Sequence, residues 1–217
     1  MKVALIGASG FVGTAILNEL LERGHQVTAL TRDNANIKKQ HENLQVVQAN
    51  VVNETELAEK VKSHDAVISS FNAGWTNPNL YEDFLSGSKA IQQGVKKSGV
   101  KRLIVVGGGG SLYTAEGVQI VDTPEFPEQI KPGATAARDY LNEIKKETDL
   151  DWTFLSPALE MHQGTAGVRK GTYRKGLENP VFDENGHSVA SVEDTAVALV
   201  DELENPQHIR ERFTVAY

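Results

Sequence analysis

Short apolar segments alternate with amphipathic segments along most of the chain. Residues 3–6 form a continuous apolar run, as expected of a strand that is buried on both faces of a parallel sheet. Apolar residues then recur every three to four positions from Val12 to Leu21, which predicts a helix, and Gly24 stands where a helix C-cap glycine belongs. A second apolar run follows at 27–30. The beginning of the chain therefore predicts a strand–helix–strand unit.

The same alternation continues through the rest of the chain. Further strands are predicted at 44–48, 65–70, 101–106, 152–155 and 213–216, and further helices at 54–62, 79–98, 132–148 and 191–204. Strands that alternate with helices are typical of an α/β fold, here a Rossmann-like, doubly wound parallel sheet. Glycines interrupt the pattern over 158–191, where we expect a small irregular substrate-side segment with short strands and hairpins around Tyr173 and Val181. No linker or repeat divides the chain, so we predict a single domain over residues 1–217.

A glycine-rich turn joins the first predicted strand to the first predicted helix. Gly7, Gly10 and Gly13 form Gly-x-x-Gly-x-x-Gly, a variant of the dinucleotide-binding fingerprint. The first glycine permits a sharp turn, the second lets the backbone approach a pyrophosphate, and the third lets the helix pack closely on the sheet. The alternative is a tight turn without a ligand. We predict that the cofactor contacts Gly7, Ser9, Gly10, Phe11, Val12 and Gly13, where helix N–H groups attract phosphate.

The end of the second predicted strand distinguishes NADP from NAD. An acidic residue there would bind the ribose hydroxyls of NAD, whereas a basic residue can pair with the 2′-phosphate of NADP. Arg32 favours NADP, with NAD as the other cofactor, unless Arg32 merely pairs with Asp33. Ligands of open α/β sheets bind outside the carboxyl ends of the strands. We therefore expect further cofactor contacts from Asn50, Val51, Phe71, Asn72, Ala73, Gly107, Gly108, Ser156 and Pro157.

The composition excludes or disfavours several classes of function. The chain has 217 residues, no cysteine and a net charge of −7, so disulfides and thiolate catalysis are excluded and a broad nucleic-acid surface is disfavoured. The six histidines show no metal-ligand spacing. No apolar run approaches the length of a membrane span, and the first residues predict a core strand rather than a signal peptide. We expect a cytoplasmic protein with a small-molecule substrate and neither a nucleic-acid nor a membrane partner; the oligomeric state is left open.

Candidate chemistry follows the fifth predicted strand. The four glycines at 107–110 would let a flat nicotinamide and a flat substrate lie against the backbone, or they form a flexible loop. The hydroxyls of Ser111 and Tyr113 are our candidate catalytic groups; the alternatives are a loop cap for Ser111 and a packed loop aromatic for Tyr113. Near the substrate we expect Trp75, Gly109 and His162, although Trp75 could simply close its loop and His162 could simply be exposed.

A basic cluster occupies the irregular segment. It could attract an anionic substrate such as a flavin phosphate, or it could form a solvated face of the molecule. Its members are Arg169, Lys170, Arg174 and Lys175.

Five segments together resemble the atypical short-chain dehydrogenase/reductases. These are residues 7–13, 23–27, 107–111, 151–157 and 191–194. Within that superfamily the chain is similar to small bacterial proteins described as candidate NADH-flavin reductases, which are related to biliverdin reductase B and the NmrA-like proteins. The resemblance implies a Rossmann-like fold, hydride transfer from a bound nicotinamide, and a hydroxyl that orients the substrate just after the fifth strand. Asn50 is a departure, because the family often has an aspartate there, near the adenine.

The acid of typical superfamily members is missing. They use Tyr-x-x-x-Lys, but none of the five tyrosines is followed four positions later by lysine. Tyr140 is followed by Lys145, and on a helix that extra position rotates the lysine away by about 100°. A flat conjugated acceptor such as a flavin (FMN or FAD) is compatible with the missing acid, because its ring system spreads the charge that the hydride brings. A non-catalytic NmrA-like redox sensor and a sugar-nucleotide epimerase or dehydratase are the open alternatives.

Overall fold

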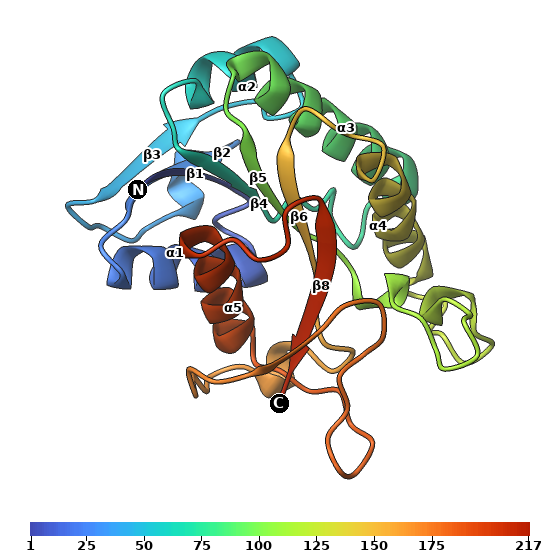
Figure 1. Cartoon of the computed structure of the whole chain (residues 1–217). Helices are drawn as coiled ribbons and strands as arrows, with labels where there is room; N and C mark the ends of the chain where they lie inside the picture. Colours follow the sequence, from blue (N-terminus) through green and yellow to red (C-terminus); the bar gives the residue numbers. More distant parts are fainter.

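A single eight-stranded sheet runs through the middle of the molecule (Figure 1), in a computed structural model that describes residues 1–217. The strand order is β3-β2-β1-β4-β5-β6-β8-β7, and every neighbouring pair is parallel except β7 with β8. The strands are β1 (Lys2–Ile6), β2 (Gln26–Thr31), β3 (Leu44–Gln48), β4 (Ala66–Ser69), β5 (Arg102–Val106), β6 (Asp151–Ser156), β7 (Arg174–Gly176) and β8 (Glu211–Ala216). The order reverses between β1 and β4, the point at which doubly wound sheets bind their ligands.

Helices cover both faces of this sheet. They are α1 (Phe11–Glu22), α2 (Glu54–Val61), α3 (Leu80–Ser98), α4 (Lys131–Ile144) and α5 (Val192–Glu204). The pair α1 and α5 packs on one face, and α2, α3 and α4 form a row on the other (Figure 1). The predicted Rossmann-like fold is therefore confirmed. None of these helices combines the length and the apolar character that crossing a membrane requires.

The first strand shows why its residues are all apolar. Val3 and Leu5 belong to the core on the α1 and α5 side, whereas Ala4 and Ile6 belong to the core on the α2, α3 and α4 side. All four side chains are at most 1% exposed. Successive residues of a strand point to opposite faces, so a strand covered on both sides needs an unbroken apolar run.

Two predicted elements differ from the structure. The helix that begins near Pro132 ends at Ile144 rather than at 148. The chain turns at Lys145 and Lys146, and the following Glu147 carbonyl accepts a hydrogen bond from the Trp152 indole at 3.2 Å. The irregular segment contains one short strand, β7, which pairs with the distant β8 instead of forming a local hairpin. No strand forms around Val181, so that prediction was wrong.

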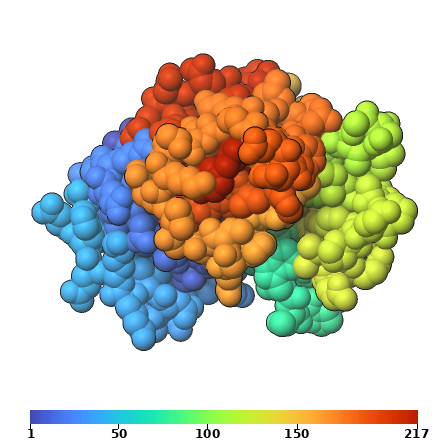
Figure 2. Space-filling view, turned by 90° about the horizontal axis from the view of Figure 1, so that it is seen from below, coloured from blue at the N-terminus to red at the C-terminus, as the bar shows by residue number.

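The irregular segment lies over the carboxyl edge of the sheet. β8 ends at the lower edge in Figure 1, and the view from below in Figure 2 looks onto that edge. There the segment 158–190, in orange, occupies the centre between the N-terminal part of the chain, in blue, and the loop 111–131, in yellow-green. The fold thus brings the carboxyl ends of the seven parallel strands and two long loops to one edge.

Candidate functional site

The glycine turn after β1 uses its three glycines in two different ways. Gly7 has φ +81°, and a Cβ on it would come within 2.5 Å of the Ser70 carbonyl oxygen. A Cβ on Gly13 would come within 2.0 Å of the Gly7 carbonyl oxygen. Gly10 is less confined, because only the Gly7 oxygen, at 3.3 Å, lies near its missing Cβ. Gly7 and Gly13 therefore allow the turn to pack, whereas Gly10 leaves the outer side of the turn open.

The N-terminus of α1 is prepared for an anion. No side chain caps it, and its first turn contains no acidic residue. Of the other helices, α2, α3 and α5 each have two acidic residues in the first turn, whereas α4 has none. Uncapped N–H groups and the positive end of the helix dipole attract negative charge. The helix that follows the glycine turn is therefore suited to a phosphate group.

A cavity of about 680 Å³ opens beside this turn, within the size range of small-molecule sites. It is bounded by the ends of β1, β2, β3 and β4 and by α3. Nine predicted cofactor residues line it, namely Gly7, Ser9, Gly10, Arg32, Asn50, Val51, Phe71, Asn72 and Ala73. The structure thus brings together the predicted contacts from four separate strand ends.

Sequence reasoning missed the wall that α3 supplies. Asp83, Ser86 and Gly87 line the cavity from that helix, and Ser70 lines it at the end of β4. A Cβ on Gly87 would come within 2.6 Å of the Phe71 ring, so this glycine allows the loop after β4 to pack on α3. A glycine within an amphipathic helix was the one signal in the sequence that could have indicated this close contact.

Arg32 lies at this cavity without a partner in the protein. Its side chain is exposed, and its guanidinium forms no hydrogen bond or ion pair with the rest of the chain, although its backbone oxygen accepts a bond from Gln48. The carboxylate of Asp33 instead accepts a hydrogen bond from the Ala35 N–H at 2.9 Å. The alternative in which Arg32 pairs with Asp33 is therefore not what the structure shows.

The second glycine run, after β5, is filled by protein. A Cβ on Gly107 would come within 1.9 Å of the Phe154 ring, and a Cβ on Gly109 within 2.8 Å of the Pro157 oxygen. Gly108 and Gly110 face α4 at 3.3 Å, through Ala137 and Ala134. Packing inside the protein is thus sufficient to explain Gly107 and Gly109, and a glycine floor beneath a nicotinamide stays a prediction.

Ser111 is buried, and its hydroxyl forms hydrogen bonds within the protein. Its hydroxyl is 0% exposed, donates to the Gly108 oxygen at 2.8 Å and lies 3.1 Å from the hydroxyl of Ser156 at the end of β6. Arg212 of β8 donates to the same hydroxyl at 3.3 Å. In this arrangement Ser111 fastens the turn after β5 to β6 and β8, as the loop-cap alternative expects, and a contact of its hydroxyl with the substrate stays a prediction.

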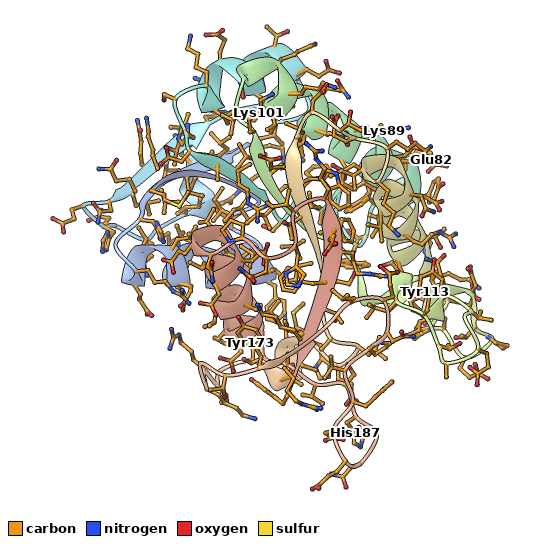
Figure 3. The ribbon with its side chains drawn as sticks, viewed as in Figure 1. Glu82, Lys89, Lys101, Tyr113, Tyr173 and His187 are labelled. Carbon is orange, nitrogen blue, oxygen red and sulfur yellow. The ribbon has the colours of Figure 1, made fainter.

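Tyr113 differs from Ser111 in its exposure. It lies at the carboxyl edge, opposite Lys101, which precedes β5 at the other edge (Figure 3). Its ring is half-buried, and its hydroxyl has no hydrogen-bond partner in the chain. Its main chain is held on both sides, because its N–H donates to the Glu178 oxygen at 2.9 Å and its own carbonyl accepts from Asn179 at 3.0 Å. Of the two predicted catalytic hydroxyls, that of Tyr113 is the free one.

The other predicted site residues have the following positions in the structure. Trp75 is 61% exposed, and its ring lies against Gly133 at the start of α4. His162 is exposed, and its Nδ1 accepts the Gly164 N–H at 3.0 Å, so a neutral ring has its proton on Nε2. Phe11 lines a separate hollow of about 620 Å³ along α1. The predicted cofactor residues that do not line the larger cavity are Phe11, Val12, Gly13, Gly107, Gly108, Ser156 and Pro157.

Most of the basic cluster in the irregular segment has partners in the protein. Arg169 forms an ion pair with Glu19 at 2.8 Å, and the Lys170 ammonium lies 3.4 Å from the centre of the Tyr217 ring. Arg174 donates to main-chain oxygens. These contacts fasten the segment to α1 and to the end of β8, so the cluster has a structural role.

Known proteins are similar to this chain over nearly its whole length. YwnB of Bacillus subtilis is 38% identical over 99% of this chain and 98% of its own. Among solved structures, a candidate epimerase of Bacteroides thetaiotaomicron is 47% identical with a TM-score of 0.91, covering 100% of this chain and 96% of that one. A candidate NADH-flavin reductase of Streptococcus pneumoniae is 36% identical with a TM-score of 0.87, covering 100% and 99%.

The family comparison agrees with the geometry of the glycine turn. The model of the NAD(P)H-binding family matches residues 7–206, which begin at the first glycine of the turn and include the cavity. The resemblance to the atypical short-chain dehydrogenase/reductases is thereby confirmed. The chain belongs to the NAD(P)H-binding family.

Proposed function

We propose that this protein is an NADPH-dependent reductase that passes a hydride to a flat conjugated acceptor, most simply a free flavin. The observation that supports it best is the unpaired Arg32 guanidinium at the cavity beside the uncapped N-terminus of α1. Two separate anion sites within one cavity match the pyrophosphate and the 2′-phosphate of NADPH. NADH has only the first of these anionic groups.

The fit of the cofactor follows from the residues of the cavity. The first-turn N–H groups of α1 would bind the pyrophosphate, and the open side of Gly10 lets it approach. Arg32 would bind the 2′-phosphate, while Asn50 and the α3 wall would enclose the adenine. When bound, the cofactor supplies the hydride, and the protein positions the two reacting molecules and excludes water.

Tyr113 is the proposed hydrogen-bond donor to the acceptor. Its hydroxyl is free and lies at the carboxyl edge, whereas Ser111 holds the turn that leads to it. Tyr140, the only tyrosine with a lysine near the required spacing, is 2% exposed in the core, and burial raises its pKa far above the ordinary value. A site with one exposed hydroxyl and no lysine helper suits an acceptor whose own rings stabilise the added charge.

The test follows the loss of reduced nicotinamide absorbance. Purified protein is mixed with NADPH and with FMN, FAD, riboflavin or a simple quinone, and the rate is compared with that of the mixture without protein. We expect acceleration with at least one flavin, and slower turnover with NADH. Binding of NADPH without acceleration of any acceptor would contradict the reductase proposal.

A redox sensor is the second candidate. The hydrogen bonds of the Ser111 hydroxyl within the protein favour it. A serine that is fully bonded within the protein supports binding without turnover. The sensor predicts that NADPH and NADP⁺ bind while no acceptor is reduced, and that the two forms give different affinities for a protein partner. An epimerase, the class of the Bacteroides relative by name, needs an acid–base pair, and Tyr140 lies too deep in the core to supply it.

A further inference from the structure

Arg212 is a buried cation for which the proposed function has no role. It lies on β8, is 2% exposed and stands beside Phe154 of β6 in the sheet register. Its guanidinium forms an ion pair with the carboxylate of Glu178, which lies just after β7. A buried charge costs free energy even when it is paired, and apolar residues of similar size often stabilise a protein as well. The contacts of Arg212 therefore need an explanation other than stability.

The first contact of Arg212 fixes the turn after β5. Its Nη1 donates to the Ser111 carbonyl at 3.1 Å and to the Ser111 hydroxyl at 3.3 Å. A guanidinium can only donate, so the Ser111 oxygen must accept. The Ser111 hydrogen is then left for the Gly108 oxygen or for Ser156. This turn leads directly to Tyr113.

The second contact of Arg212 is with Tyr113 itself. The guanidinium carbon lies 5.8 Å from the centre of the Tyr113 ring, within the range of a cation–π interaction. Glu178, the ion-pair partner of Arg212, also accepts the Tyr113 N–H through its main chain. Arg212 and the segment it anchors thus hold both the ring and the backbone of Tyr113, while the hydroxyl has no partner.

We propose that Arg212 is a positioning residue that holds Tyr113 in the orientation from which its hydroxyl reaches the substrate. This inference rests on the proposed function, because it assigns Tyr113 the contact with the acceptor. Arg212 touches no substrate itself, since it is buried, and it does not line the cavity assigned to the cofactor. Its loss should therefore lower kcat and leave the KM for NADPH unchanged.

The kinetic test compares two buried arginines. Arg212→Lys keeps a positive charge opposite Glu178 but loses the planar fork, and kcat should fall about tenfold. Arg102→Lys is the matched control, because Arg102 is also buried and paired with a glutamate, Glu202 at 3.3 Å, but makes no contact with Ser111 or Tyr113. Its kcat should stay at the wild-type value.

A double-mutant cycle shows whether Arg212 acts through Tyr113. In a Tyr113→Phe background, Arg212→Lys should lower kcat by less than about twofold, because the group it positions is already gone. An equal fall in both backgrounds, or an equal fall in Arg102→Lys, would overturn the proposal.

A second measurement needs neither cofactor nor substrate. The protein is labelled with 3-fluorotyrosine at its five tyrosines, and the ¹⁹F resonance of Tyr113 is identified by its loss in Tyr113→Phe. Arg212→Lys should shift or broaden that resonance, and Arg102→Lys should leave it in place. An unchanged resonance in Arg212→Lys would overturn the proposal. A resonance that moves, in a protein that reduces no acceptor, would support the positioning role and refute the reductase function.

Discussion

Two glycine-rich turns leave the same edge of the sheet, yet they differ in what surrounds them. In the turn 7–13 the end residues Gly7 and Gly13 are closely packed, but Gly10 in the middle faces the cavity. In the run 107–110 a Cβ on Gly107 or Gly109 would come closer than 3.0 Å to protein atoms, and the nearest of these belong to the Phe154 ring, whereas a Cβ on Gly108 has one neighbour at 3.3 Å, as on Gly10. One turn leaves room for a ligand, whereas the other lets α4 and β6 come close.

The role of a glycine motif therefore depends on the groups that surround it. Glycine allows the backbone to approach another group closely, but that group can be a phosphate or the protein itself. In the sequence both turns indicate a ligand close to the backbone, a pyrophosphate at 7–13 and a flat nicotinamide and substrate at 107–110. Only the surroundings, an open cavity in one case and packed side chains in the other, separate them.

The largest effect should come from filling the packed turn. Gly107→Ala would place a methyl group against the buried Phe154 ring, so we expect a loss of about 3 kcal/mol of unfolding free energy. Urea denaturation measures it. The double variant Gly107→Ala with Phe154→Leu should recover part of the loss, and a single variant as stable as the wild type would contradict the packing explanation.

A substitution in the turn 7–13 should affect cofactor binding more than stability. Gly10→Ala should change the unfolding free energy by about 1 kcal/mol or less, as expected at a helix N-cap. It should weaken NADPH binding by about thirtyfold, or about 2 kcal/mol, because the methyl group occupies the approach of the pyrophosphate. Calorimetric titration gives the affinity. If Gly10→Ala loses stability but binds NADPH normally, the contrast between the turns disappears.

Arg32 sharpens the contrast within the cofactor cavity. Arg32→Gln should weaken NADPH binding about tenfold and leave NADH binding unchanged, since only NADPH has the 2′-phosphate. Lys39→Gln is the matched control, because Lys39 is a cation on the same loop that does not line the cavity and is bonded to Asn18 at 2.6 Å. Equal losses for both cofactors would contradict the role assigned to Arg32.

The smallest effect concerns the anchoring of the irregular segment. Asp194 is buried, which by itself would raise its pKa, but hydrogen bonds from Tyr217, Lys170 and Gly171 lower it on balance. A carboxyl whose pKa is lower in the folded protein stabilises it above the unfolded pKa, and this contribution is lost as the pH falls through the folded pKa. Wild-type stability should therefore fall more between about pH 5 and pH 2 than that of Asp194→Asn, measured by urea denaturation across that range.

The sequence was sufficient for the features that depend on neighbouring residues. The alternation of strands and helices, the turn 7–13 and Arg32 at the end of β2 all follow from local patterns. Contacts between distant residues were not accessible in this way. Arg212 and Ser111 are 101 positions apart, and the wall formed by Asp83 and Ser86 depends on how α3 packs against the loop after β4.

The most direct test of the NADPH proposal isolates the adenosine half of the cofactor. Wild-type protein is titrated by calorimetry with 2′,5′-ADP and with 5′-ADP, which differ by the one phosphate that Arg32 is proposed to bind. We predict that 2′,5′-ADP binds at least about tenfold more tightly and competes with NADPH. Equal affinity for the two, or no binding of 2′,5′-ADP, would contradict it.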